Sequence, residues 1–563
     1  MRYSYLARLV GSDKGGKRMR RQKVFSIPDQ ITKLIVVVLL SPVLLLAIRT
    51  WGLETDNWEH LRNYLLGEAV ITTLWLAFLS VFGAGVVGVL GAWLVSCYDF
   101  PFRRTFEWLL MLPIAIPPYI AAYVYAGTLS YTGSVQATAR SFGLFIPQHW
   151  LDIMSLPGAS FIFIITLYPY VYIIVKSFLK QHSGQFVENA RVMGYGSFGI
   201  LMKIVLPLIR IPLVGALILV LMEIISDYGV VKYYGLQTIS TLIFKAWFGL
   251  RDLGLAGRLS LGLLMGIMII LSIEEWIRGR RGYSLGSGKS GVITLIKLHS
   301  TGRILALGFL MTVILIAFVI PVSQMVFWAV LAWENVDIIG ISKVFKSTVM
   351  MSILAAMIIL ILSILIGHRT RFLGNRVSGI INRMTQVGYS IPGAVIAVGT
   401  LILFVSLDGL LYPFYQSLNS DTKKLILTSG LGMLLFAYVV RYLAIGYNSV
   451  QAGFTKIGDR FREASTVLGY STGETLIKIE IPMLQRSLIA GFILVFIDVL
   501  KELPLTLLLR PFNYDSLATM VYVYAGDERI HEASIPSLAI VGISLIAVIL
   551  LEIFNQQKKE KRK

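Results

Sequence analysis

The sequence predicts an all-α polytopic membrane protein made of two tandem six-helix domains, with about twelve transmembrane helices in all. The first observation is composition: 56% of the 563 residues are hydrophobic and the mean hydropathy is +0.74, too apolar for a soluble protein. The second is a series of apolar runs, each long enough at ~20 residues to cross a bilayer. The third is an internal repeat with a fixed offset of 275 residues, the spacing from Glu188 to Glu463.

The chain begins with a polar, basic segment, residues 1–33, which leads into the apolar run Leu34 to Ile48. A signal peptide is the competing interpretation, but the run ends in Arg49-Thr50-Trp51 and no small-residue cleavage site follows. We therefore expect the first transmembrane helix here, with the amino terminus in the cytoplasm. The first domain (34–277) is expected to contain five further spans, near residues 68–95, 107–128, 158–178, 211–231 and 257–274.

Residues 278–302 are basic and rich in Gly and Ser, which is the composition of a flexible linker. Gly288-Lys289-Ser290 imitates the end of a phosphate-binding loop. That motif also requires a glycine at 283, where this chain has Tyr283, and a strand ahead of it. The sequence therefore predicts no nucleotide site in this chain.

The second domain (303–553) repeats the pattern and is followed by a basic tail, residues 554–563. The offset that relates Glu188 to Glu463 also aligns Thr73 with Thr348 and Ile116-Pro117 with Ile391-Pro392. One offset at three separate places indicates duplication of a whole six-helix domain, a recurring feature of transporters. Because an even number of spans restores the orientation, we expect a pseudo-twofold axis along the membrane normal. The expected spans lie near 304–331, 347–366, 385–406, 426–447, 487–509 and 533–553.

The net charge of +20 is explained by topology. Most of the 51 Lys and Arg residues fall in the two termini, the linker and alternate loops, when Lys176 and Arg441 are counted at the inner ends of their spans. This distribution satisfies the positive-inside rule with both termini cytoplasmic. Some attraction to anionic lipid is expected, and no nucleic-acid partner is needed.

Cysteine and histidine usage excludes several classes of site. The single cysteine, Cys97, cannot form an internal disulfide, and the six histidines are scattered without ligand spacing. A membrane enzyme would need a catalytic constellation, which these residues do not supply. We expect no catalytic residue and no cofactor bound by this chain.

Two segments are related most closely by the repeat, Glu188 to Pro207 and Glu463 to Pro482. Each is predicted to be a short helix, stopped by a glycine that can adopt the left-handed conformation, followed by an amphipathic piece that ends at proline. They are expected to be surface elements on one side of the membrane, although two ordinary amphipathic loops related by duplication would look similar. The identical pairs are Glu188/Glu463, Val192/Val467, Gly194/Gly469, Tyr195/Tyr470, Leu201/Leu476, Lys203/Lys478, Ile204/Ile479 and Pro207/Pro482.

Four carboxylates lie within apolar runs: Glu223 and Asp227 in one, Asp498 and Glu502 in the other. Each pair is four residues apart and therefore on one helical face, and the two pairs are related by the same offset. Carboxylates so placed are costly and usually face a cavity or an ion path. The alternative is that they cap helices or pair with Lys501 and Lys232 near the outer interface.

In the two repeated segments the sequence resembles the permease subunits of bacterial ATP-binding cassette (ABC) importers. The family signature is Glu-Ala-Ala, then Gly, then Ile-x-Leu-Pro; here the first copy has Glu188-Asn189-Ala190 and the second Glu463-Ala464-Ser465, while the spacing from Gly to Pro is kept. The resemblance implies a type I permease fold and two coupling helices that dock on a cytoplasmic ATPase. The implied coupling residues are Glu188, Ala190, Gly194, Pro207, Glu463, Ala464, Gly469 and Pro482.

The segments around the buried acids narrow the resemblance. Met222 to Gly229 with Phe244 to Gly249, and Asp498 to Pro504 with Leu509 to Asn513, look like the fused permease subunit of ferric iron importers. The resemblance implies a bacterial inner-membrane protein, two copies of an ATPase that binds ATP and Mg²⁺, and an extracytoplasmic binding protein that delivers ferric iron.

Carboxylates are hard oxygen donors suited to a trivalent cation, so the four acids are expected to line the translocation pathway and to contact the metal transiently. Fused permeases for thiamine, polyamines or phosphonates share the architecture. A secondary cation carrier, from another class, also uses repeats and buried acids, but it needs no paired cytoplasmic coupling loops.

Overall fold

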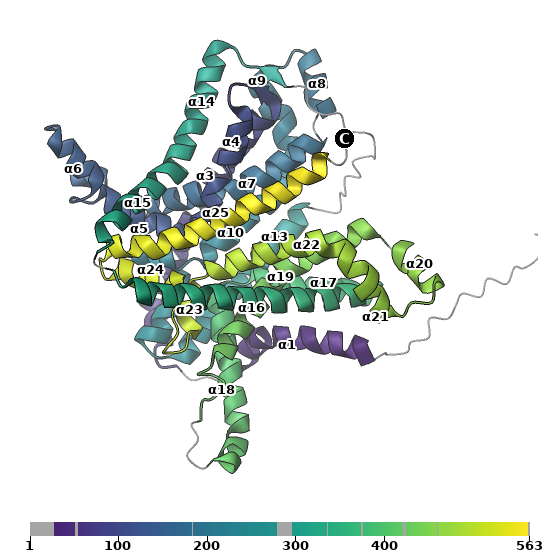
Figure 1. The fold of residues 1–563 in the computed structure, drawn as a ribbon. Coiled ribbons are helices and arrows are strands. Elements are labelled where there is room, and N and C mark those ends of the chain that lie inside the picture. The colour runs from purple at the N-terminus through teal and green to yellow at the C-terminus, as the bar shows by residue number, and fades with distance from the viewer. Residues whose placement is uncertain are drawn as a thin grey trace, which may run out of the picture.

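The computed structural model describes residues 27–50, 55–182, 184–278, 295–334, 336–372, 375–419, 424–458 and 460–560. Most of the basic amino-terminal segment, most of the predicted linker with Gly288 and Lys289, and the end of the basic tail lie outside these residues. The described residues are helical almost throughout (Figure 1). Among them, strands β1 (Tyr98–Asp99) and β2 (Ile296–Lys297) pair in parallel, with Tyr98 opposite Ile296.

The described part of the first half contains thirteen α-helices, some joined by short 3₁₀ or π-helical stretches. Its long helices follow apolar runs, and a proline that would break the ladder, such as Pro42 in α1 or Pro169 in α7, is tolerated within a bundle. The helices are α1 (Ile27–Arg49), α2 (Trp58–Tyr64), α3 (Leu66–Cys97), α4 (Arg103–Leu109), α5 (Pro118–Leu129), α6 (Ser134–Ser141), α7 (Leu156–His182), α8 (Gly184–Val192), α9 (Ser197–Ile200), α10 (Leu206–Ser226), α11 (Gly229–Tyr233), α12 (Ile239–Phe244) and α13 (Leu253–Arg278).

The second half repeats these elements at the predicted offset, so that α3 corresponds to α16, α7 to α19, α10 to α22 and α13 to α25. Its helices are α14 (Ser300–Ile314), α15 (Ile320–Ala332), α16 (Ile338–Thr370), α17 (Asn375–Val387), α18 (Gly393–Leu418), α19 (Leu431–Ile457), α20 (Arg460–Val467), α21 (Thr472–Thr475), α22 (Ile481–Leu500), α23 (Pro504–Leu509), α24 (Leu517–Gly526) and α25 (Ile530–Glu560).

The described residues contain ten helices long and apolar enough to cross a membrane, or up to eleven if a bent pair counts as one span. The bent pair is Arg103–Ala115 with Pro118–Ser141, which meet at 92° and carry the span predicted near 107–128. The first predicted span lies in α1, which is not one of the ten. The prediction of an all-α polytopic membrane protein is confirmed.

The helix pair α3–α7 and its counterpart α16–α19 each pack closely at a glycine. A Cβ at Gly88 of α3 would lie 2.6 Å from the Val171 side chain of α7, and a Cβ at Gly446 of α19 would lie 2.6 Å from Ile359 of α16. The offset relates Gly88 to Ser363 and Val171 to Gly446, so the glycine is on α3 in one half and on α19 in the other. Each contact keeps the small residue that lets helix backbones approach in a membrane.

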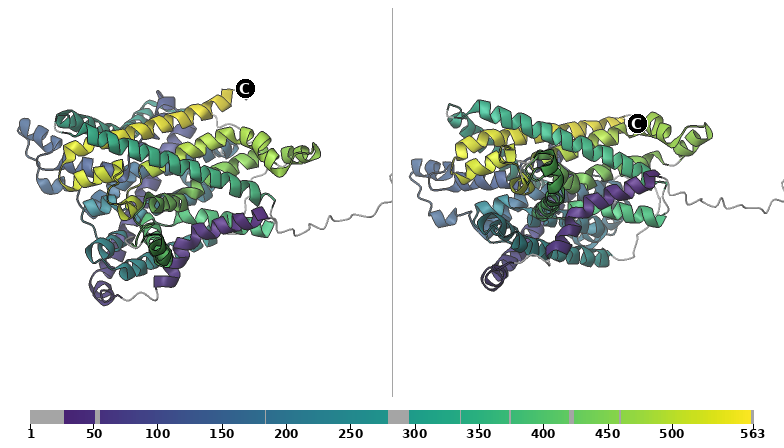
Figure 2. Two further views of the ribbon diagram at one scale, coloured as in Figure 1. Left: turned by 60° about the horizontal axis from the view of Figure 1, so that its bottom comes forward. Right: turned by 90° about the horizontal axis from the view of Figure 1, so that it is seen from below.

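The flanking helices of each half pack on the other half. One apolar core joins α3, α5, α7 and α10 with residues of α14, α15 and α25 from the second half. The other core joins α16, α18, α19 and α22 with residues of α1, α12 and α13 from the first half. The two views of Figure 2 agree with this exchange, since α1 lies beside the second-half helices. The exchange ties the repeats into one bundle with an interface at its centre.

Candidate coupling segments and central cavity

The two repeated segments, Glu188 to Pro207 and Glu463 to Pro482, are named the coupling segments after the role that the resemblance implies, and α8 and α20 are their coupling helices. Both form the predicted helix, glycine and helix. Gly194 follows α8 with φ +81°, and Gly469 follows α20 with φ +84°. The N–H of Tyr195 donates to the Ala190 carbonyl at 3.1 Å, and the N–H of Tyr470 donates to the Ser465 carbonyl at 3.1 Å. These are the bonds of a helix C-terminus closed by a left-handed residue. The helices begin slightly earlier than predicted, at Gly184 and Arg460 instead of Glu188 and Glu463.

After each glycine the chain passes through a short helix and a five-residue π-helical turn into a long membrane helix. In the first half these are α9, Leu201–Val205 and α10, whose second residue is Pro207. In the second half they are α21, Leu476–Glu480 and α22, whose second residue is Pro482. Each proline lies inside a helical run that continues through it, Ser197–Ser226 or Thr472–Leu500, close after the π-helical turn, and it lacks the N–H that would continue the backbone ladder there. Each coupling segment is thus continuous with a helix that enters the bundle.

The two coupling segments expose apolar side chains at equivalent positions. Val192 and Val467 are 89% and 87% exposed, and the next residues, Met193 and Leu468, are also exposed. Glu188 is half-buried and Glu463 is exposed. Repeated exposed apolar residues of this kind are typical of a docking surface.

The two alanines predicted in the coupling helices, Ala190 and Ala464, differ in burial. Ala190 is buried, but Ala464 is exposed and the buried counterpart of Ala190 is Ser465. The Ser465 hydroxyl lies 2.6 Å from the Thr475 hydroxyl and joins α20 to α21. Ala190 and Ser465 are equivalent because they are 275 residues apart. The Glu-Ala-Ala pattern instead pointed to Ala464.

A buried charge cluster anchors the second coupling segment. Glu480, at the start of α22, lies 2.6 Å from Nδ1 of His368 and accepts a hydrogen bond from Arg371 Nη1 at 2.7 Å. Arg371 Nη2 donates to the Gly458 carbonyl, and Arg462 Nη1 of α20 donates to the Arg371 carbonyl. The cluster therefore joins the end of α16 to both sides of the coupling helix. Sequence reasoning missed it because its members are far apart in the chain.

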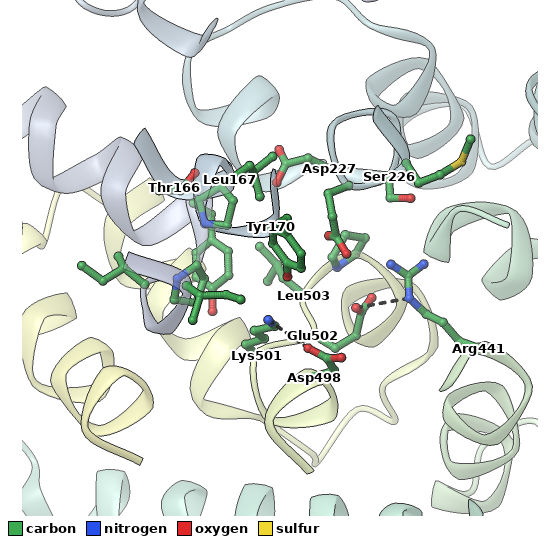
Figure 3. Close-up of a pocket in the computed structure, with 18 of the residues that line it drawn as sticks. Thr166, Leu167, Tyr170, Ser226, Asp227, Arg441, Asp498, Lys501, Glu502 and Leu503 are labelled. Atoms are coloured by element: carbon green, nitrogen blue, oxygen red, sulfur yellow. Dashed lines mark ion pairs between the residues drawn. The ribbon is translucent and has the colours of Figure 1, made fainter. Parts of the chain in front are cut away.

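The four predicted intramembrane carboxylates all line one cavity of about 80 Å³ between the halves (Figure 3). Equivalent helices supply them: α10 and the turn after it carry Glu223 and Asp227, and α22 and the turn after it carry Asp498 and Glu502. The repeat thus places all four acids around one cavity. Their role in translocation and in metal contact stays a prediction.

The two acids of the second half are paired with cations. Arg441 Nε lies 3.5 Å from Glu502, and Lys501 Nζ lies 2.9 Å from Asp498 (Figure 3). Glu502 also accepts hydrogen bonds from the Tyr442 hydroxyl and, at 2.9 Å, from the Leu505 N–H. Asp498 thus makes the pairing with Lys501 that the alternative interpretation considered. These contacts give both acids a structural role.

The two acids of the first half have different surroundings. Asp227 accepts a hydrogen bond from the Val230 N–H at 2.9 Å, at the start of α11. Within the described part of the chain, Glu223 makes no ion pair or hydrogen bond. The positions that correspond to Arg441 and Lys501 are Thr166 and Ser226, which carry no charge. Among the described residues that line the cavity, the four carboxyl groups therefore face two cationic side chains, and the two acids without an ion pair belong to the first half.

Arg441 and four tyrosines also line the cavity, and the sequence did not predict them there. Arg441 was counted at the inner end of its span, but it lies in the middle of α19 with its side chain in the cavity. Gly393 makes room for it, since a Cβ there would lie 2.5 Å from Arg441 Nη1. An arginine inside an apolar run was a signal for a buried ion pair. Four tyrosines also line the cavity: Tyr119, Tyr170, Tyr389 and Tyr442.

No group of three or more His, Cys, Asp or Glu side chains in the described residues is placed to hold a metal ion. The four acids share a cavity without converging on one point. Direct coordination by several of them would require the two halves to move together. The arrangement supplies hard oxygen atoms and two fixed cations along a passage between the halves.

The chain is similar to permease proteins of transport systems for different substrates. The family described as binding-protein-dependent transport system inner membrane component matches residues 24–274 and 359–558. The Fe(3+)-transport system permease protein FbpB 2 of Haemophilus influenzae is 22% identical over 535 residues, which cover 93% of this chain and 98% of that protein. The sulfate transport system permease protein CysT of Escherichia coli is 27% identical over 203 residues, which cover 35% of this chain and 70% of that protein. A chain of a bacterial alginate ABC transporter structure is 18% identical, with a TM-score of 0.38, over 45% of this chain and 93% of that one.

Proposed function

This chain belongs to the family of binding-protein-dependent transport system inner membrane components and is a permease subunit of an ABC importer, and we propose that its cargo is ferric iron. Iron is supported chiefly by the alignment with the Fe(3+)-transport relative, which includes both halves in one chain and spans nearly all of both proteins. The sulfate relative matches about a third of this chain. The fused architecture therefore favours iron over sulfate.

The proposed mechanism couples two cytoplasmic ATPase subunits to the central cavity. The ATPases bind ATP and Mg²⁺ and contact the exposed residues around Val192 and Val467. Each coupling segment runs into α10 or α22, and at 1.5 Å per residue such a helix of ~20 residues carries a displacement over roughly 30 Å to the acids. Closure of the ATPases would rock the halves and open the cavity to one face at a time. The permease itself performs no covalent chemistry.

The chemistry of the cavity is compatible with a hard cation on its first-half side. Glu223 and Asp227 present carboxylate oxygens without a cation from their own helix, and tyrosines supply further oxygens nearby. Oxygen ligands are preferred by hard, highly charged ions. The second-half acids are held by Arg441 and Lys501, so they shape the passage and leave Glu223 and Asp227 for the cargo.

Localisation follows from the same assignment. The chain is a multi-pass membrane protein, and we place it in the bacterial inner membrane with both termini and both coupling segments cytoplasmic. The basic residues near the termini support this orientation. An extracytoplasmic binding protein would then deliver iron at the opposite end of the bundle.

Sulfate is the second candidate, because sulfate permeases are among the relatives and because Arg441 and Lys501 place two cations in the cavity. The test uses proteoliposomes that contain the permease with its ATPase, supplied with the binding protein and either ⁵⁵Fe³⁺ or ³⁵S-sulfate. We expect ATP-dependent uptake of iron that excess sulfate does not inhibit. ATP-dependent sulfate uptake without iron uptake would refute the proposal, and the Gly194→Val and Gly469→Val double variant provides the uncoupled control.

A further inference from the structure

A second cavity, larger than the first at about 870 Å³, lies between the halves at the end of the bundle away from the coupling segments. The helices α10 and α22 run from the coupling segments to the acids, and the elements that follow them in the chain form the walls of this cavity. The cavity therefore lies beyond the acids. Residues of α11, α12 and the turn 245–249 contribute from the first half. Residues of α23, α24 and the loop between them contribute from the second. We call this cavity the vestibule.

The vestibule has an excess of positive charge. Three cationic side chains, Lys232, Lys245 and Arg510, line it, and Asp515 is its one acidic residue among the described residues. Asp515 forms an ion pair with Arg510, so its charge is already compensated. Within the same part of the chain Lys232 and Lys245 have no ion pair, and both are exposed. Two ammonium groups from one half therefore lie at the cavity without a protein counter-ion.

An aromatic layer separates the vestibule from the central cavity. The Tyr228 ring stacks on Phe244 with centroids 3.5 Å apart, and the Tyr522 hydroxyl donates to the Tyr228 hydroxyl at 3.4 Å across the halves. Asp227 lines the central cavity while its neighbour Tyr228 lines the vestibule. On the other half, Pro504 lines the central cavity and Leu507, one turn later in α23, lines the vestibule. The two cavities are thus consecutive along the interface between the halves.

We propose that the vestibule binds a small anion with several oxygen atoms, such as a polycarboxylate or an inorganic oxyanion, either free or as the ligand shell of ferric iron. The proposal rests on the importer function proposed above, because it assumes that substrate enters between the halves at this end. Unpaired lysines attract anions and repel a bare trivalent cation. A ferric ion would therefore reach the acids beyond the aromatic layer in company with an anion that offsets its charge.

The test is anion binding by the purified full-length permease, measured by isothermal titration calorimetry with citrate, sulfate and ferric citrate as separate probes. The variant Lys232→Gln with Lys245→Gln should weaken binding roughly tenfold for each lysine, because charge-assisted hydrogen bonds are lost. Lys343→Gln with Lys346→Gln is the matched control. These two exposed lysines near the start of α16 lie outside the vestibule lining, and their replacement removes the same charge from the same end of the bundle.

The outcomes separate the possible sources of the anion. If ferric citrate binds more tightly than citrate, and only the vestibule variant loses this binding, the result would support entry of a chelate. If citrate or sulfate binds as tightly as ferric citrate, and only the vestibule variant loses this binding, the result would support a free anion. Equal binding by the vestibule variant and the control variant would overturn the proposal. So would normal anion binding accompanied by loss of binding-protein association, because an acidic segment of that protein would then be the occupant. Since these measurements need no ATP, a failure of iron uptake with intact vestibule binding would refute only the iron assignment.

Discussion

Gly194→Val combined with Gly469→Val should uncouple transport from ATP hydrolysis. Both glycines close a coupling helix in the left-handed region, with φ of +81° and +84°. A Cβ added at either glycine would meet no atom within 4 Å, so packing does not require glycine there. The substitution therefore tests backbone conformation alone.

The magnitude follows from that conformation. Holding an L-residue in the left-handed region costs about 1–2 kcal/mol, and a β-branched residue is an outlier there. At 1.4 kcal/mol per factor of ten, each substitution should lower the population of the correct turn roughly tenfold. The exposed residues Val192 and Val467 would then be presented in the wrong place, while the membrane helices beyond the turn stay intact. Asparagine tolerates this conformation, so Gly194→Asn with Gly469→Asn should retain most of the activity.

The assay is ATP-driven uptake in proteoliposomes, together with co-purification of the ATPase and the amount of permease in the membrane. The double valine variant should lose uptake and ATPase association at normal membrane levels. The control is Gly196→Val with Gly473→Val, which changes glycines in the same segments that have open space and no positive φ. Full ATP-driven uptake by the Gly194→Val and Gly469→Val variant, or equal losses in the control, would show that the left-handed turns do not carry the coupling.

Three further predictions concern topology, the pathway and the anchor of the second coupling segment. An impermeant maleimide should label Lys289→Cys and Lys558→Cys only after the cytoplasmic face is opened; labelling of both from outside would reject the orientation. Glu223→Gln should reduce iron uptake at least several-fold with unchanged expression and basal ATPase activity, since this acid has no structural partner in the described residues; normal uptake would exclude it from the pathway. Glu480→Ala should lower the free energy of unfolding by roughly 3–5 kcal/mol, because it leaves half-buried Arg371 without its carboxylate and buried His368 without its hydrogen-bond partner; an unchanged thermal midpoint in detergent would contradict that interpretation of the cluster.

The overall fold could be predicted because membrane insertion leaves few alternatives. Apolar runs of sufficient length must become helices, since a bilayer cannot satisfy backbone polar groups. The repeat then predicted the correspondence between the halves, and the structure keeps it for the long helices, as in α7 and α19, although α5 is much shorter than its counterpart α18. What the periodicity could not show is the exchange of flanking helices, because α1 and α25 are apolar on several sides and could pack on either half.

The candidate site was predictable only in part. The offset identified the four acids, and symmetry then required them to approach one axis. The offset also hides differences between the halves, because Arg441 corresponds to Thr166 and Lys501 to Ser226. Lys501 lies three residues after Asp498, so that pairing could be considered from the sequence. The pairing of Glu502 depends on which residue α19 places beside it, and therefore on the rotation of α19 against α22. Sequence alone does not determine this rotation.

The asymmetry leads to a last prediction, that Arg441 supports structure through Glu502. Replacing it with its repeat counterpart, Arg441→Thr, leaves a buried carboxylate without its cation and should lower the free energy of unfolding by about 3–5 kcal/mol. Adding Glu502→Gln removes the uncompensated charge, and the amide can still accept the Leu505 N–H, so most of the stability should return. Thermal unfolding of the two variants in detergent measures the difference. If Arg441→Thr alone is harmless, the pair contributes nothing to folding. If Arg441→Thr destabilises the protein and Glu502→Gln does not restore its stability, the loss does not come from the uncompensated charge of Glu502, and the prediction is wrong.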